Sequence, residues 1–227
     1  MTQPDAWTTG IQTVATQFMP FMAAVVFHEF AHGWAASKWG DTTAKDAGRL
    51  TLNPMPHIDP VGTLLFPLIN MFTGIPILFG WARPVPIDPR RFRKFRAGLF
   101  WVSFAGPLMN FLLAIASANA CVALLIWVPE EFYLQEPLQR MALVSVSLNF
   151  ALGIFNLIPL PPLDGSKMVE SILPLRMIRK YESLSRFSVV ILLALMFTGA
   201  IRVISGPIEF LTRATLSVAL QLMSGLG

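Results

Sequence analysis

The chain has 227 residues, of which 54% are hydrophobic and 13% are charged, and it carries a net charge of +4. Soluble globular proteins carry about 25% charged residues, so this composition excludes a disordered chain, a nucleic-acid-binding tail and an ordinary cytosolic enzyme. It predicts a polytopic membrane protein, in which the single Cys121 can form neither an internal disulfide nor a cysteine-based zinc site.

Apolar stretches long enough to cross a bilayer recur along the chain. The first covers residues 11–39, enough to span about 30 Å of hydrocarbon. The next, over 61–81, is interrupted by two prolines and a glycine. Four more follow, over residues 97–128, 141–160, 187–204 and 206–227. The last carries Glu209 and Arg213, so it is either a final span or a surface helix.

The loops between these stretches differ in charge. Residues 83–96 hold six basic side chains and one acidic one, whereas residues 129–140 hold three glutamates and one arginine. By the positive-inside rule, the 83–96 loop and the net-basic 166–186 stretch lie on the cytoplasmic side. The acidic loop then lies on the opposite side, which agrees with the 97–128 and 141–160 stretches crossing in opposite directions.

The first apolar stretch contains the motif H-E-x-x-H, as His28-Glu29-Phe30-Ala31-His32. Positions i and i+4 share one face of a helix, so both imidazoles can bind one zinc ion. Glu29 can take a proton from zinc-bound water without being a ligand. Ionisable groups are costly inside a membrane helix, so we interpret the motif as a catalytic metal site rather than a structural polar cluster.

A catalytic zinc needs a third protein ligand and leaves the fourth position to water. Asp164 is the preferred candidate, because it follows a proline-rich break, N-L-I-P-L-P-P-L-D-G, at the end of an apolar stretch. The alternative role for Asp164 is to cap the helix that begins at Ser166. His57, in a polar loop, is a competing third ligand, although a local hydrogen bond is the better explanation for a loop histidine.

Two asparagines are candidates for contacts with a substrate. Asn110 lies in A-G-P-L-M-N, within the 97–128 stretch, and Asn156 precedes the proline-rich break. Peptide hydrolysis in a bilayer needs donors for an oxyanion and for an unwound substrate strand, and amide side chains supply them without charge. The alternative is interhelical hydrogen bonding, which we assign to Asn119 and Asn149.

These motifs, in this order and in apolar stretches, resemble the site-2 protease family of intramembrane zinc metalloproteases, the M50 class. The resemblance spans residues 28–165 and implies that His28, His32 and Asp164 hold one zinc ion and that Glu29 is the catalytic base. It also implies substrate-binding roles for Asn110 and Asn156. Many members of this family carry a PDZ or CBS domain, which this sequence lacks, so it resembles a minimal member.

We therefore expect an all-α polytopic membrane protein with about five to six transmembrane helices. A short β element over residues 47–52 follows the first helix. Residues 1–227 form a single membrane-embedded metalloprotease domain, with a catalytic core over about 11–165 and further helices over 166–227. Because the zinc ligands must meet at one depth, the first span should end on the cytoplasmic side, where Asp164 lies. The basic 83–96 loop is also cytoplasmic, so both ends of 61–81 lie on that side. We therefore expect this segment to form a re-entrant or interfacial hairpin.

The expected function is zinc-dependent endopeptidase cleavage of transmembrane segments, as in regulated intramembrane proteolysis. We expect single-span membrane proteins as substrates, no nucleic-acid partner, and residence in the bacterial plasma (inner) membrane with the active site open towards the cytoplasm. A substrate strand could pair with residues 47–52. The alternative function is a metal-ion transporter or channel that uses the same His/Glu/Asp cluster, although such sites usually lie in repeated halves, and no repeat is visible.

Overall fold

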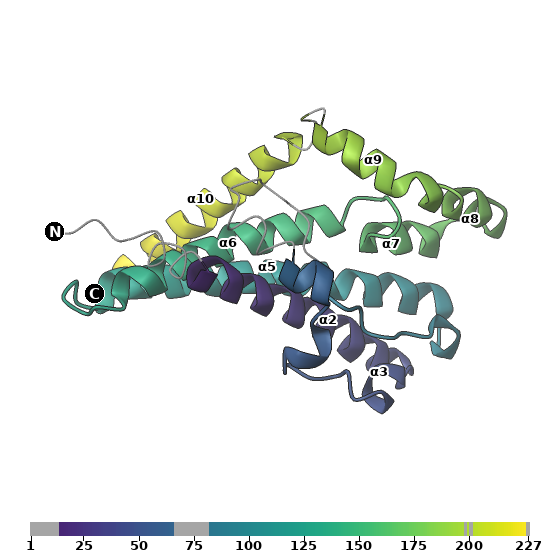
Figure 1. Ribbon diagram of the computed structural model, residues 1–227, viewed down its shortest axis with the longest axis horizontal. Coiled ribbons are helices and arrows are strands. Elements are labelled where there is room, and N and C mark those ends of the chain that lie inside the picture. The colour runs from purple at the N-terminus through teal and green to yellow at the C-terminus, as the bar shows by residue number, and fades with distance from the viewer. Residues whose placement is uncertain (1–13, 66–81, 198, 200–201, 226–227) are drawn as a thin grey trace.

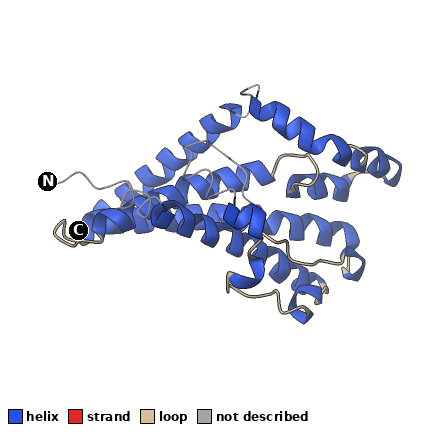
Figure 2. Cartoon of the chain, in the orientation of Figure 1, coloured by secondary structure: helices blue, strands red, loops and turns tan. Residues whose placement is uncertain are grey.

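A computed structural model describes residues 14–65, 82–197, 199 and 202–225 of the chain. Within these ranges the protein consists of helices, turns and irregular segments, without a strand (Figure 2). The longer helices are α2 (Met19–Trp39), α5 (Phe95–Trp127), α6 (Gln135–Asn156), α7 (Asp164–Ile172), α8 (Leu175–Glu182), α9 (Ser185–Phe197) and α10 (Arg202–Ser224). The short helical elements are η1 (Val14–Phe18), α3 (Thr43–Asp46), η2 (Met55–His57), η3 (Pro60–Leu65) and η4 (Pro89–Arg91).

Helices α2, α5 and α6 lie side by side and form the centre of the molecule (Figure 1). Small side chains allow α2 and α5 to approach closely, with Ala35 and Ala36 packed against Leu99 and Val102. A second cluster joins α5 to α6 through Ala114, Ala118, Val146 and Phe150, and leucine and isoleucine side chains of α10 cover it. This packing fixes α5 against both of its neighbours.

Helix α2 has a defined end, which sets the start of the following loop. Gly40 adopts a positive φ of 109°, and its N–H bonds back to the carbonyls of Ala36 and Ser37. Only glycine takes this left-handed conformation at little cost, so the helix stops there. The next residue, Asp41, is fully buried and binds the following turn.

Three described helices are long and apolar enough to cross a membrane. They are α5, α6 and the Val203–Ser224 part of α10, and most of each apolar window is not covered by protein. Their positions match the predicted stretches 97–128, 141–160 and 206–227. The total of five to six spans stays a prediction, and the predicted hairpin over 61–81 lies outside the described residues except for 61–65, which belong to η3.

The predicted β element over residues 47–52 is wrong. Ala47 and Gly48 form a turn in which Gly48 has a φ of 66°, and the chain continues irregularly to Pro54. The N–H groups of Ala47 and Gly48 bond back to the carbonyls of Thr43 and Lys45. These backbone groups are therefore committed to ending α3, and residues 47–52 form no strand in the structure.

The buried carboxylate of Asp41 should contribute to the stability of the fold. Its carboxylate accepts hydrogen bonds from the N–H groups of Thr43 (3.0 Å) and Asp88 (2.7 Å), so it joins two segments of the chain. Replacing Asp41 with Ala leaves both donors without this acceptor, which should cost about 2–3 kcal/mol. We expect thermal unfolding of the detergent-purified protein to shift down by about 5–10 °C. The exposed Asp46→Ala control should change Tm little, and equal shifts would contradict this role.

Candidate metal centre

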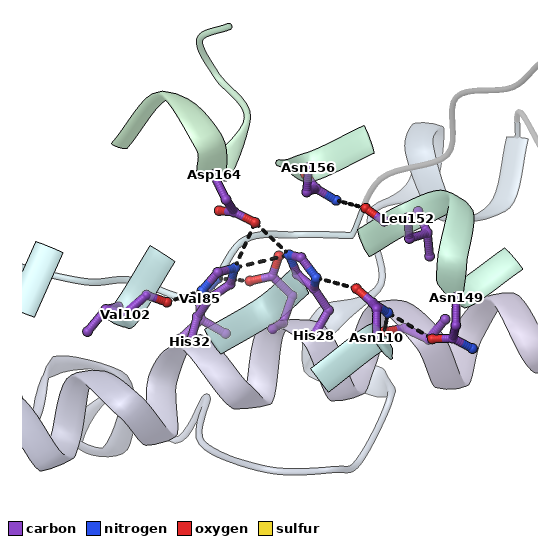
Figure 3. Close-up of polar contacts among 11 residues, drawn as sticks. His28, His32, Val85, Val102, Asn110, Asn149, Leu152, Asn156 and Asp164 are labelled. Atoms are coloured by element: carbon purple, nitrogen blue, oxygen red, sulfur yellow. Dashed lines mark hydrogen bonds and ion pairs between the residues drawn. The ribbon is translucent and has the colours of Figure 1, made fainter. Parts of the chain in front are cut away.

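His28 and His32 lie one helical turn apart on the buried face of α2. Their Nε2 atoms are 3.0 Å apart, and the rings meet edge to face with centroids 4.6 Å apart (Figure 3). Side chains at i and i+4 project from the same face of a helix, so the H-E-x-x-H spacing brings both Nε2 atoms to one point. Both side chains are buried.

Asp164 reaches this point from a distant part of the sequence. It is the first residue of α7, and its Oδ2 lies 3.1 Å from His28 Nε2 and 3.3 Å from His32 Nε2 (Figure 3). The following residue, Gly165, packs so tightly on the backbone that a Cβ there would overlap the carbonyls of Leu157 and Ile158. The turn after α6 thus fixes the position of the carboxylate.

The other ring nitrogen of each histidine has an acceptor of its own. Nδ1 of His28 lies 2.6 Å from Oδ1 of Asn110, and Nδ1 of His32 lies 2.7 Å from the carbonyl oxygen of Val102. A carbonyl accepts only, so Nδ1 carries the proton in both neutral rings once the Asn110 amide is oriented by its other contacts. Both Nε2 atoms are then lone-pair acceptors that face Asp164.

Two imidazole nitrogens and one carboxylate oxygen thus converge as hydrogen-bond acceptors without a donor, and a bound cation would stabilise this arrangement. The Oδ2 atom of Asp164 is buried, and the described residues include no hydrogen-bond donor for it in this protonation state. One proton can bridge only one pair of these atoms, whereas a divalent ion contacts all three. Tetrahedral zinc with bonds of about 2.0–2.1 Å requires ligand atoms about 3.3 Å apart, close to the observed 3.0, 3.1 and 3.3 Å. The group His28, His32 and Asp164 thus fits zinc.

Helix α5 can approach the histidines because Gly106 lacks a side chain. A Cβ at this position would overlap both imidazole rings. One turn to either side, Val102 and Asn110 supply the acceptors for the two Nδ1 atoms. The A-G-P-L-M-N sequence therefore combines close helix packing with orientation of a histidine.

The amide of Asn110 is committed to protein contacts. Besides accepting from His28, it donates through Nδ2 to Asn149 Oδ1 (2.8 Å) and to the carbonyl of Ala24 (3.3 Å), as Figure 3 shows for Asn149. Asn149 in turn donates to Ser145. The side chain is fully buried, so its geometry favours orientation of His28, and its predicted contact with a substrate remains untested.

Glu29 contacts a different segment of the chain, at Val85. Its Oε2 accepts a hydrogen bond of 2.8 Å from the backbone N–H of Val85. It is not one of the residues whose ligand atoms gather at a single point. A carboxylate next to a metal site, held on one oxygen and without a hydrogen bond to the other among the described residues, is suited to general-base chemistry.

The two remaining candidates, His57 and Asn156, make local hydrogen bonds. His57 is fully buried in η2, where its Nε2 lies 2.9 Å from the carbonyl of Thr51. It does not join the metal-binding group, so the local hydrogen bond is the reading that the structure favours. The amide of Asn156 donates 3.0 Å along its own helix to the Leu152 carbonyl (Figure 3), and its predicted substrate role also remains untested.

Sequence reasoning missed two groups that support the site. They are the Val102 carbonyl and the Val85 N–H, which bind His32 and Glu29 respectively. Backbone groups leave no trace in side-chain motifs, so neither could be found. The interhelical hydrogen bond expected of Asn149 is present, because its Oδ1 accepts from Asn110 of the neighbouring helix.

Comparison with known proteins gives a consistent result. The family described as Peptidase family M50 matches residues 122–199, a range that includes Asp164. The chain is 37% identical over 186 residues to the "Putative zinc metalloprotease YwhC" of Bacillus subtilis, covering 79% of this chain and 81% of that protein. No solved structure matches the chain.

More distant relatives carry a similar name. The "Putative zinc metalloprotease Rip2" of Mycolicibacterium smegmatis is 26% identical, over 80% of this chain and 66% of that protein. Its namesake in Mycobacterium tuberculosis H37Rv is 30% identical, over 77% of this chain and 64% of that protein. Together with the apolar helices and the zinc-compatible cluster, these matches show that the chain belongs to peptidase family M50, the site-2 protease family, and is a membrane zinc metalloprotease.

Proposed function

We propose that the protein cleaves peptide bonds within the transmembrane segments of other membrane proteins. The observation that carries this proposal is the position of the metal site along α5. The residues of α5 that touch the histidines, Val102 and Asn110, are 7 and 15 residues from its first residue, or about 10–23 Å along the helix. A site beside the interior of an apolar helix is suited to a substrate in the same membrane.

The residues of the chain divide the chemistry between them. His28, His32 and Asp164 would hold zinc, which supplies Lewis acidity towards a carbonyl and water when bound. Glu29 takes the proton from the attacking water on the oxygen that does not bind Val85 and returns it to the leaving amine. Asn110 and the Val102 carbonyl hold the two imidazoles in the tautomer that presents Nε2.

The substrate must present an accessible carbonyl. A hydrogen-bonded helix hides its backbone groups, so we expect cleavage near residues that form helices weakly, such as glycine. The cytoplasmic opening of the site and residence in the bacterial plasma membrane remain parts of this proposal, based on the basic 83–96 loop.

Replacing Glu29 with Gln tests the proposed role directly. Gln keeps the size of the side chain and removes its basicity, so cleavage of a co-reconstituted single-span reporter should fall at least about 100-fold. Zinc content, measured by plasma mass spectrometry, should stay at one per chain. Glu130→Gln, in an exposed loop, is the matched control and should cleave normally.

Two results would contradict the proposal in different ways. Wild-type cleavage by Glu29→Gln would exclude Glu29 as the base. Cleavage products that all map outside the transmembrane segment of the reporter would exclude intramembrane proteolysis. Zinc flux into vesicles that depends on the histidines, without any cleavage, would instead support the metal-transporter alternative.

Asp164→Ala tests the ligand set. Removal of the carboxylate leaves two imidazoles, which hold zinc poorly, so the purified variant should retain far less than one zinc per chain and lose cleavage. A chelator should have the same effect on the wild-type protein, with recovery on adding zinc back. Full zinc content in Asp164→Ala would show that another group supplies the third ligand.

Asn110 provides a further prediction about zinc affinity. Partners of metal-bound histidines typically contribute 10–100-fold to metal affinity, so Asn110→Ala should raise the zinc dissociation constant by about that factor. Asn110→Asp, which keeps an acceptor for His28 Nδ1, should lose less. Asn119→Ala is the matched control, because this half-buried asparagine of α5 bonds only to Ile115 of its own helix among the described contacts. Competition with a chromophoric chelator measures all three, and an unchanged constant in Asn110→Ala would contradict the role.

A further inference from the structure

Residues 82–88, which we call the strap, pass over α2 next to Glu29. The strap is irregular, and two of its seven residues, Pro84 and Pro86, have a fixed φ. The residues before them, Arg83 and Val85, are restricted to extended conformations. The strap is therefore stiff, and the N–H of Val85 has a defined direction.

Both ends of the strap are anchored by backbone hydrogen bonds. The N–H of Arg83 bonds to the carbonyl of the buried His57 (2.8 Å), and the N–H of Asp88 bonds to the Asp41 carboxylate (2.7 Å). Between these anchors Val85 is buried against α2 at Gly33, where an added Cβ would lie 3.2 Å from Val85 Cγ1. Gly33 lies one turn beyond Glu29, so the strap meets α2 at the catalytic turn.

One side chain holds the centre of the strap. Nη2 of Arg49 donates to the carbonyls of Arg83 (2.7 Å) and Pro84 (3.3 Å). The Pro84 oxygen and the Val85 N–H belong to the same peptide group, and this N–H is the one that binds Glu29 Oε2 at 2.8 Å. Arg49 thus binds one end of a planar unit whose other end binds the proposed base.

We propose that Arg49 is a positioning residue for Glu29, acting through the Pro84–Val85 peptide group. This inference rests on the proposed role of Glu29 as the base. With Oε2 held by Val85, the rotation of the carboxylate is restricted and its second oxygen stays available for water. A cation at the carbonyl end also polarises the peptide group, which strengthens the N–H donor.

The electrostatic surroundings of Arg49 agree with this assignment. Burial and the nearby Arg83 lower the pKa of Arg49, whereas Glu29 raises it. The guanidinium is therefore within electrostatic reach of the carboxylate, although the two are joined through the strap. Arg49 must keep its charge near neutral pH to hold the strap, and arginine does so because its ordinary pKa lies far above neutral.

The test uses hydrogen exchange together with kinetics on the full-length protein in detergent. Residues 83–88 have only four N–H groups, at Arg83, Val85, Ile87 and Asp88, so exchange of Val85 can be resolved by mass spectrometry. In Arg49→Ala we expect Val85 to exchange at least about 10-fold faster, with α5 unchanged and zinc retained. Cleavage of the single-span reporter should show kcat lowered about 10- to 100-fold with KM nearly constant.

Two further variants separate positioning from general stability. Arg49→Lys keeps the charge and one donor, so it should restore part of kcat and part of the Val85 protection. Lys45→Ala removes a neighbouring exposed cation that makes no contact with the strap among the described residues. This variant should match the wild-type protein in both measurements. Fast exchange throughout the protein in Arg49→Ala, or equal losses in kcat and zinc, would show a merely structural role and overturn the inference.

The outcomes also separate this inference from the proposed function. If Glu29→Gln loses cleavage while Arg49→Ala keeps wild-type kcat, the positioning role of Arg49 is wrong and Glu29 remains the base. If Glu29→Gln cleaves normally, the proposed function itself fails, whatever Arg49 does. Unchanged exchange at Val85 in Arg49→Ala would show that the strap does not depend on the guanidinium.

Discussion

The site depends on one electrostatic constraint: two imidazole nitrogens and one carboxylate oxygen meet within 3.3 Å of each other, with lone pairs facing inwards. Such an arrangement is unfavourable unless a cation occupies the common point, and it is costly in the low-dielectric surroundings of apolar helices. The rest of the fold can be understood as the means of holding these three atoms together. Helix α2 provides the imidazoles, and the break between α6 and α7 provides the carboxylate.

Support for this constraint comes mainly from α5. A glycine in α5 allows the helix to approach the imidazole rings, and a backbone carbonyl and an amide fix their tautomers. Asn110 extends the polar network to α6 through Asn149. Such a network is satisfied internally, as it must be where water is scarce. The strap performs the equivalent function for Glu29.

The sequence allowed part of this site to be predicted, for physical reasons that are specific to each residue. The spacing of His28 and His32 determines a shared helical face, and the chemistry of zinc requires a third ligand, which directed attention to Asp164. The helices around the site were predicted because long apolar stretches have few alternatives in a membrane.

Other features could not be predicted, because they depend on how distant segments pack. The contact between Glu29 and the Val85 N–H joins residues 56 positions apart through a backbone atom. The strand expected at residues 47–52 failed because Gly48 adopts a left-handed turn that ends α3. Asn110 was assigned to the substrate from its chemistry alone, whereas its position next to His28 depends on how α5 crosses α2.

X-ray absorption at the zinc edge of the purified protein tests the central claim most directly. The account predicts a first shell of two imidazole nitrogens and oxygen donors at about 2.0–2.2 Å, with imidazole outer-shell scattering that disappears when both histidines are replaced. A shell made only of oxygen atoms, one that contains sulfur, or one that persists without the two histidines would contradict it.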